Sequence, residues 1–247
     1  MSTGGIEVDG SQIESGTSVF VKVLTWAGLG LLGLIGILVA GFVIVPPATR
    51  SFTDRWGATP EEVSMEMPGD DLFDARREVS TRAVTIDAPP DLVYSLLVQM
   101  GQHRAGWYGW DWFYNLTGSS DFVDGHYSRR IVPELQDLWA GDTISINDMV
   151  QYQVVAAERP KYLVLHAGSV EPYEEPTGTW TANTMAFLIE PLPDDRSRLI
   201  LRIRADSSET GFAKWVWNNP LNFGGALFAR KTIVGLRRTA EEIAAER

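Results

Sequence analysis

The run of 23 residues from Val23 to Val45 carries no charged side chain and constrains this chain more than any other feature. As a helix that rises 1.5 Å per residue, it is long enough to cross a bilayer core of about 30 Å. A secretory signal peptide is the alternative, but its apolar region usually spans about 7–15 residues and is followed by a small-residue cleavage site. The stretch LVAG lies inside the apolar run instead of after it. We therefore expect a retained single-pass anchor, ended by Pro46-Pro47.

The residues around the anchor bear on its orientation and its partners. Lys22 is the only basic residue before it, whereas Arg50 and Arg55 follow it. Basic residues favour the cytoplasmic side, which predicts a cell-membrane protein with its C-terminal domain in the cytoplasm. Gly36 and Ala40 form a small-xxx-small pair, which is typical of membrane helices that approach one another closely.

The composition excludes several classes of function. The net charge of −11 argues against a nucleic-acid partner, because phosphate binding requires a basic face. The chain has no cysteine, which excludes disulfides and thiolate metal sites. The three histidines, His103, His126 and His166, lack the spacing typical of zinc ligands, so we expect no metal. No phosphate-binding or dinucleotide-binding fingerprint is present, and we expect no cofactor.

Composition also divides the chain into segments. The N-terminal residues are polar and contain Gly, Ser and Thr, which predicts disorder. The residues after the anchor include apolar side chains, so we expect them to pack on the domain that follows. Within them, Thr59, Pro60 and Glu62 have the spacing of a helix cap with a proline at the first helical position. The predicted segments are a disordered tail (1–18), a transmembrane anchor (19–47), a connector (48–78) and a folded domain (79–247).

The folded domain starts with the patterns of a strand and then a helix. Val84 and Ile86 alternate in STRAVTIDA, which predicts a strand. The next segment, DAPPDLVYSLLVQMG, predicts a helix with Asp87 as its cap. Its apolar residues recur with the spacing of one buried stripe, formed by Val93, Leu96, Leu97 and Met100.

A period of two residues follows, which is typical of strands. In the last such segment, three arginines (Arg198, Arg202, Arg204) alternate with apolar residues, as in a sheet with one solvent-exposed face. The turns between segments are short, which predicts an antiparallel meander. The predicted strands cover residues 142–147, 149–158, 162–168, 178–192 and 197–206.

The chain ends in a long predicted helix, residues 221–246. Gly224, Gly225 and Gly235 lie within it, and each costs about 1 kcal/mol relative to alanine in a helix interior. Such glycines favour close approach to the sheet or to a molecule bound beneath the helix.

Six aromatic residues occupy the eight positions from Trp107 to Tyr114, within AGWYGWDWFYNLTG. Tryptophan and tyrosine bury a large area and keep a polar tip, so this aromatic block suits a core plug or a pocket wall. Contact with a membrane surface is a third alternative.

These segments resemble the bacterial branch of the SRPBCC (START / Bet v 1 / polyketide cyclase) superfamily. The resemblance is carried by TRAVTIDAPPDLVYSLLVQMG, the aromatic block, SRRIVPELQDLWAGDTI and LFARKTIVGLRRTAEE, and it spans roughly residues 55–240. It implies an α+β helix-grip fold, a curved antiparallel sheet around the long C-terminal helix, here preceded by one transmembrane helix. It also implies an apolar cavity for a hydrophobic molecule, and it carries no universal catalytic motif.

Candidate site residues follow from the aromatic block and from strand alternation. We expect ligand contacts from Trp107, Tyr108, Trp110, Trp112, His166, Met185, Phe187 and Phe228. The catalytic candidates are His166, as an acid or base, and Asp111, which lies between two tryptophans. For Asp111, a structural ion pair with Arg104, Arg129 or Arg130 is the alternative.

Three functions remain open at this point. The first is a membrane-anchored binding protein for a hydrophobic small molecule or lipid. The second is a cyclase or dehydratase acting on a hydrophobic substrate. The third is an accessory subunit of a membrane complex, docked through the glycine-rich anchor.

Overall fold

The structure is a computed structural model that describes residues 10–72, 78–116, 121–170, 172, 174 and 177–246, with side chains from residue 21 onward. The chain divides into two compact units, residues 1–48 and 49–247. Residues 1–9 of the predicted tail and residues 73–77 of the predicted connector lie outside the described residues.

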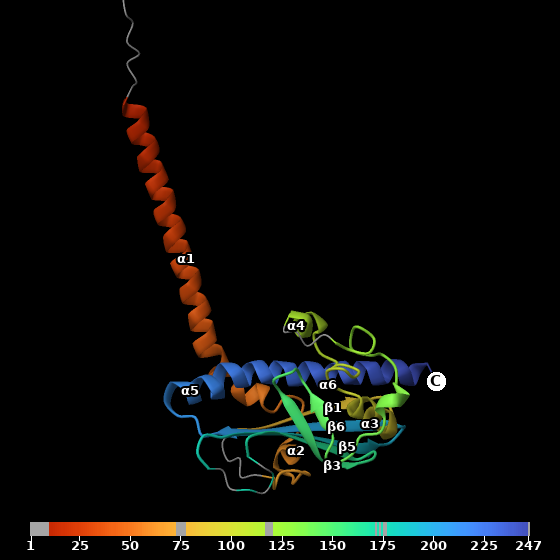
Figure 1. Cartoon of the computed structure of the whole chain (residues 1–247). Helices are drawn as coiled ribbons and strands as arrows, with labels where there is room; N and C mark the ends of the chain where they lie inside the picture. The colour runs from red at the N-terminus through yellow and green to blue at the C-terminus, as the bar shows by residue number, and fades with distance from the viewer. Residues whose placement is uncertain are drawn as a thin grey trace, which may run out of the picture. The chain divides into compact units, whose positions relative to one another are not determined.

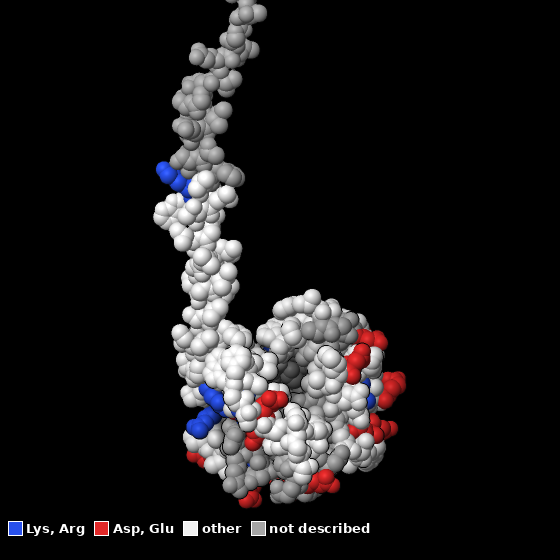
Figure 2. All heavy atoms as spheres, turned by 60° about the vertical axis from the view of Figure 1, so that its left-hand side comes forward, with Lys and Arg blue, Asp and Glu red and all other residues white. Residues whose placement is uncertain are grey.

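Helix α1, Gly10–Thr53, contains the whole predicted anchor (Figure 1). It begins within the segment predicted to be disordered, and it continues through Pro46 and Pro47, where we expected it to end. Beyond the prolines the helix is extended by a turn in which the Asp54 amide donates to the Arg50 carbonyl at 2.9 Å. The described part is long and apolar enough to cross a membrane, and Figure 2 shows its surface almost free of charged side chains. Such a helix is a candidate for a membrane span or a signal sequence.

The second unit is built on a six-stranded antiparallel sheet with the strand order β1-β6-β5-β4-β3-β2. Its strands are β1 (Glu78–Ile86), β2 (Thr143–Ser145), β3 (Gln151–Glu158), β4 (Tyr162–Gly168), β5 (Thr181–Leu192) and β6 (Arg196–Ser207). All six strands overlap segments predicted from alternation, which confirms the antiparallel meander. Because β1 pairs with β6, the first and last strands lie side by side.

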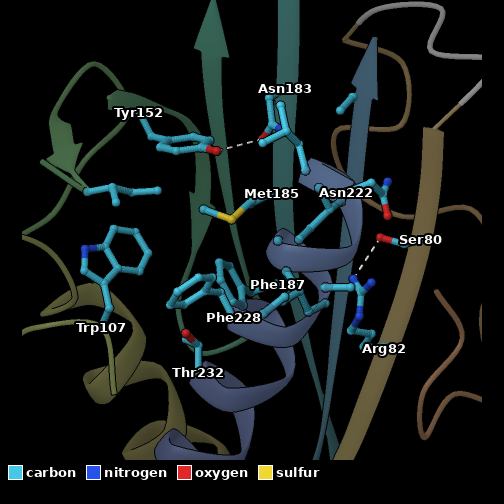
Figure 3. A pocket seen from close by; sticks show the side chains of 18 of the residues that line it. Ser80, Arg82, Trp107, Tyr152, Asn183, Met185, Phe187, Asn222, Phe228 and Thr232 are labelled. Atoms are coloured by element: carbon cyan, nitrogen blue, oxygen red, sulfur yellow. Dashed lines mark hydrogen bonds between the residues drawn. The ribbon is translucent and has the colours of Figure 1, made fainter. Parts of the chain in front are cut away.

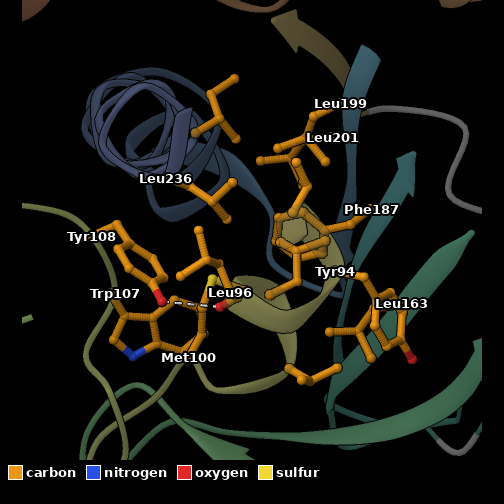
Figure 4. Packing of buried hydrophobic residues seen from close by; sticks show 14 of the residues in the cluster. Tyr94, Leu96, Met100, Trp107, Tyr108, Leu163, Phe187, Leu199, Leu201 and Leu236 are labelled. Atoms are coloured by element: carbon orange, nitrogen blue, oxygen red, sulfur yellow. Dashed lines mark hydrogen bonds between the residues drawn. The ribbon is translucent and has the colours of Figure 1, made fainter. Parts of the chain in front are cut away.

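Two helices cover the inner face of the sheet. They are α3 (Pro90–Val98) and α6 (Asn222–Ala245), which runs along the sheet in Figure 1. Inner-face side chains such as Phe187 and Leu201 form one buried cluster with Ile233 and Leu236 of α6, part of which Figure 4 shows. A six-stranded antiparallel sheet with a long C-terminal helix fits a helix-grip-like fold.

The four residues of the predicted stripe, Val93, Leu96, Leu97 and Met100, are all fully buried. Burial is not confined to one stripe, however, because every residue of α3 from 92 to 98 is buried, and Met100 lies just past the end of the helix. The predicted cap is wrong. The N-cap is Pro89, whose carbonyl accepts from the amides of residues 92 and 93, and the helix starts at a proline, whose fixed φ suits the first position. Asp87 lies two residues too early to cap this helix.

The outer face of the sheet, which we expected to meet solvent, is covered by the connector. Arg202 is 3% exposed, and its guanidinium donates to the carbonyl of Met65 at 2.7 Å and to Asp70 at 2.5 Å. Arg198 pairs with Glu62 at 2.7 Å. Carbonyl and carboxylate oxygens of the connector accept hydrogen bonds from Arg198 and Arg202 of β6. These contacts hold the connector against the outer face of the sheet.

The helix cap predicted within the connector is confirmed. Thr59 caps the short helix α2 (Pro60–Ser64), and the side chains of Thr59 and Glu62 satisfy each other's backbone amides. Nearby, the carbonyls of Asp54 and Trp56 accept hydrogen bonds from β1, at the amides of Thr81 (2.8 Å) and Ala83 (3.1 Å). The connector therefore also covers the free edge of β1, which an exposed edge strand otherwise leaves open to pairing.

Candidate ligand cavity

A cavity of about 360 Å³ lies between the inner face of the sheet and α6 (Figure 3). Most of its wall is apolar, and this part is formed by Trp107, Phe113, Ile146, Met185, Phe187, Leu201, Ile203, Ala205, Trp217, Leu221, Gly225, Ala226, Phe228 and Ala229. The polar side chains in the wall are those of Ser80, Arg82, Tyr114, Tyr152, Asn183, Asn222 and Thr232. This volume and lining are typical of pockets that take small hydrophobic molecules.

The first part of the aromatic block divides between core and cavity wall. Trp107 lines the cavity, and its Nε1 donates to the carbonyl of Ser145 at 3.2 Å. Tyr108 is fully buried in the core and does not line the cavity. Its hydroxyl donates to the carbonyl of Leu96 at 3.1 Å and accepts from the Gln99 amide at 2.9 Å. The backbone of Tyr108 has a positive φ of 53°.

The rest of the block forms helix α4 (Asp111–Leu116) and the residue before it. Phe113 lines the cavity, with its ring centroid 4.5 Å from that of Phe228. Trp110 contacts the same Phe228 ring at 5.2 Å but does not line the cavity. Trp112 points away and is 64% exposed, because its position on the short helix faces solvent.

Four predicted ligand contacts therefore meet in one cavity: Trp107, Met185, Phe187 and Phe228. In Figure 3, Met185, Phe187 and Phe228 lie between Trp107 on one side and Arg82 on the other. Both strand residues come from β5, where the large side chains at 185 and 187 alternate with the small Ala186.

His166 lies on the opposite face of the sheet from the cavity. Leu163 and Leu165 of β4 point into the inner cluster, so the alternate residues Val164 and His166 point outward. The His166 Nε2 lies 2.7 Å from the carbonyl of Val170. A carbonyl only accepts, so this ring nitrogen carries the proton and the histidine fixes the turn after β4.

Asp111 also lies outside the cavity wall. Its Oδ1 accepts from the amide of Tyr127 at 3.3 Å, which ties the start of α4 to that loop. The arginines expected as partners have other contacts: Arg104 donates to the Val98 carbonyl at 2.8 Å, and Arg130 pairs with Asp124 at 2.9 Å. Asp111 thus pins the aromatic block through a backbone contact.

The polar end of the cavity was not among our predictions. Arg82 of β1 is 1% exposed and lines the cavity, and its guanidinium donates to the Ser80 hydroxyl at 2.8 Å. Asp54 lies 3.5 Å away, and burial lowers the pKa of the Arg82 guanidinium to about 10 despite this carboxylate. The signal was in the sequence, because Arg82 alternates with Val84 and Ile86, which we had assigned to one buried face.

A network of charged and polar side chains extends from the polar end of the cavity. Arg50 donates to Asp54 at 3.2 Å and to Glu78 at 2.7 Å, and the same Glu78 oxygen accepts from Asn222 at 2.7 Å. Burial raises the pKa of the Glu78 carboxyl above its usual value. The end of α1, the start of β1 and the start of α6 meet in this network.

A second polar pair lies in the cavity wall at Tyr152 and Asn183. The tyrosine hydroxyl donates to the Asn183 Oδ1 at 2.8 Å. Burial raises the pKa of Tyr152 above its usual value, and burial and then Asp111 do the same for Tyr114. Both phenols are therefore neutral and weak acids, suited to hydrogen bonding.

No family model and no curated protein sequence matches the chain. Solved structures do align with it, the following three at 14–16% identity. A protein from Mesorhizobium loti (MLL2253) aligns at 14% identity over 67% of this chain and 98% of its own, with a TM-score of 0.38. A protein from Arthrobacter aurescens aligns at 14% over 73% and 92%, with a TM-score of 0.40. CalU16 from Micromonospora echinospora aligns at 16% over 68% and 86%, with a TM-score of 0.30.

Proposed function

We propose that this chain is a membrane-anchored protein of the SRPBCC type that binds a hydrophobic small molecule or lipid in the cavity between its sheet and α6. The observation that carries the proposal is the cavity itself, about 360 Å³ in volume and walled mainly by apolar side chains. An apolar ligand is driven into such a site because burial removes its surface from water, at about 25 cal/mol for each Å².

The membrane anchor makes physical sense for this function. Hydrophobic molecules concentrate in membranes, and a tether holds the cavity at high effective concentration near them. We place α1 across the cell membrane and the second unit on the cytoplasmic side, from the basic residues Arg50 and Arg55 that follow the apolar run.

Binding is favoured over catalysis by the chemistry of the cavity wall. Among the described residues, the wall contains no histidine and no carboxylate, and the two catalytic candidates, His166 and Asp111, lie outside it. Its tyrosines are weak acids. The wall can therefore hold and orient a ligand, and it offers no group tuned for proton transfer near neutral pH.

The experiment compares the molecules that co-purify with the full chain and with a variant whose cavity is filled. The chain is extracted from membranes in polymer-bounded discs without detergent, and its bound molecules are identified by mass spectrometry. Ala226→Phe fills the cavity from α6, where Ala226 is buried in the wall. Arg238→Phe, on the exposed side of the same helix, is the matched control.

We expect one hydrophobic species to be enriched with the wild type and with Arg238→Phe, and to be lost with Ala226→Phe. Equal recovery from all three proteins would show that the species belongs to the surrounding membrane, and the proposal would be wrong.

A further inference from the structure

We infer that the polar end of the cavity, Ser80 and Arg82 on β1, takes the carboxylate of a single-chain amphiphile whose apolar tail fills the rest. This inference rests on the proposed function and adds the chemical class of the ligand. It depends on three observations: the position of Arg82, the state of its charge, and the size of the cavity.

Arg82 is the only cationic side chain among the described residues of the cavity wall. Figure 3 shows Arg82 and Ser80 together on one side of the cavity and Trp107 on the other, with Met185 and Phe228 between them. A ligand that spans the cavity therefore meets a charged group at one end and apolar side chains along the rest of its length.

The charge of Arg82 is only partly compensated by its neighbours. A guanidinium remains protonated and has five N–H donors arranged as a fork. Its ion pair with Asp54 is long, at 3.5 Å, and its other contact is the neutral Ser80 hydroxyl. Within the described part of the chain, the Arg82 Nε has no hydrogen-bond partner although it is buried. A buried donor and a buried charge in this state both favour an additional acceptor that carries negative charge.

Nearby carboxylates do not supply that acceptor. The other oxygen of Asp54 accepts from Arg50 at 3.2 Å, so this carboxylate is shared between two arginines. Glu78 is on the same face of β1 but directs its charge to Arg50 and Asn222, and it does not line the cavity. A ligand carboxylate would accept two parallel hydrogen bonds from the Arg82 guanidinium, which is the geometry that arginine and carboxylate form best.

The size of the cavity limits the tail. At about 30 Å³ for each non-hydrogen atom, the value for a water molecule in the liquid, the cavity holds roughly a dozen atoms. That is enough for one alkyl chain and too little for a two-chain lipid. A carboxylate also matches the charge better than a phosphate monoester, because a dianion would exceed the single partly compensated cation.

The test compares two photoreactive probes with the full chain in phosphatidylcholine nanodiscs. The probes are a carboxylic acid and an alcohol that share a chain of about eight carbons with a diazirine near its end, so that each has roughly a dozen non-hydrogen atoms. After illumination, labelled peptides are identified by mass spectrometry. We expect the acid to label cavity-lining peptides, such as those with Met185 or Trp107, at least about tenfold more than the alcohol at equal membrane concentration.

The outcomes separate this inference from the proposed function. Equal labelling of the cavity by both probes would overturn the carboxylate inference and leave hydrophobic binding in place. Labelling by neither probe in the cavity would overturn the proposed function, and the inference with it.

Variants then assign the preference to Arg82. Arg82→Met should reduce the ratio of acid to alcohol labelling to about one, whereas Arg238→Gln removes an exposed charge and should leave it unchanged. Retained labelling by the alcohol shows that the cavity of Arg82→Met is intact. An Arg82→Met protein that keeps both alcohol labelling and the preference for the acid would overturn the inference.

A second variant applies if Arg82→Met does not fold. Asp54→Asn removes the carboxylate that competes for Arg82, so acid labelling should rise relative to the wild type. Unchanged or reduced acid labelling in a folded Asp54→Asn protein would contradict a role for Arg82 in carboxylate binding.

Discussion

Gly235 of α6 packs directly against the carbonyl oxygen of Tyr108, so that a β-carbon at position 235 would lie 1.9 Å from that oxygen. This contact joins the C-terminal helix to the start of the aromatic block. It also explains why a residue with a low helix propensity lies in the middle of a long helix: the contact requires the absence of a side chain.

Gly235→Ala should therefore destabilise the fold. Either the helix or the backbone of Tyr108 must move, and forced overpacking of this kind typically costs about 1–3 kcal/mol. Gly224→Ala is the matched control, because nothing lies within 4 Å of a β-carbon there and alanine favours helix by about 1 kcal/mol. Thermal unfolding of the full chain in nanodiscs would measure both. A Gly235→Ala protein as stable as the Gly224→Ala protein would contradict the contact.

The packing of the connector on the sheet leads to a second prediction. Arg202→Ala should lower the free energy of unfolding by about 3–5 kcal/mol, because it removes the buried donor of the Met65 and Glu62 carbonyls and leaves Asp70 with only its longer pair to Arg204, at 3.4 Å. Arg238→Ala breaks an exposed pair with Glu242 at 2.9 Å and should change the free energy of unfolding far less, because solvent screens such a pair. Urea unfolding would compare the two. Similar losses would mean that the connector does not hold Arg202 as described.

The same arginine shows where sequence patterns stop being informative. Alternation predicted the strands well, because large apolar and polar side chains take turns along β6. It gave the wrong surroundings for Arg202, because the segment that covers it comes from more than 100 residues earlier in the chain. Local periodicity reports which face a residue is on, and it does not report what lies against that face.

His166 and Arg82 show the same limit within the candidate site. In β4 both faces of the sheet are buried, so the run around His166 is apolar on both sides and alternation cannot tell inside from outside. In β5 alternation selected Met185 and Phe187, and both residues do line the cavity. The meeting of Arg82 with Asp54 depends on the connector running along the edge of β1, which no local pattern contains.

Glu78 makes folding stability decrease as the pH rises, which is the opposite of the usual effect of a carboxyl group with a lowered pKa. Burial raises the pKa of this carboxyl above 4.5, although hydrogen bonding to Arg50 opposes the shift. The native state then holds the proton more tightly than the unfolded state does. The stability that this group contributes is present below pH 4.5 and is lost as the pH rises through the raised value. Relative to Glu78→Gln, the wild type should lose stability as the pH rises above 4.5.

Glu62 provides the control with the opposite sign. The hydrogen bond from Arg198 lowers the pKa of Glu62 below 4.5, so its contribution is present above that pH and is lost on acidification through the lowered value. Relative to Glu62→Gln, the wild type should lose stability as the pH falls below 4.5. Urea unfolding at a series of pH values on both sides of 4.5 would measure each difference. Parallel trends for the two variants would contradict the assignment.

The division of the aromatic block gives the last prediction. Trp107 is 4% exposed and lines the cavity, whereas Trp112 is 64% exposed, although the two lie five residues apart. Trp107→Ala should lower the free energy of unfolding by about 3–5 kcal/mol, because it leaves a large void beside the core. Trp112→Ala removes a mostly solvated side chain and should change it by less than about 0.5 kcal/mol. If Trp112→Ala leaves stability intact but weakens binding of the second unit to phosphatidylcholine vesicles, this tryptophan contacts the membrane surface. If Trp112→Ala destabilises the fold as much as Trp107→Ala does, the block acts as one core plug and its division between core, cavity and surface is wrong.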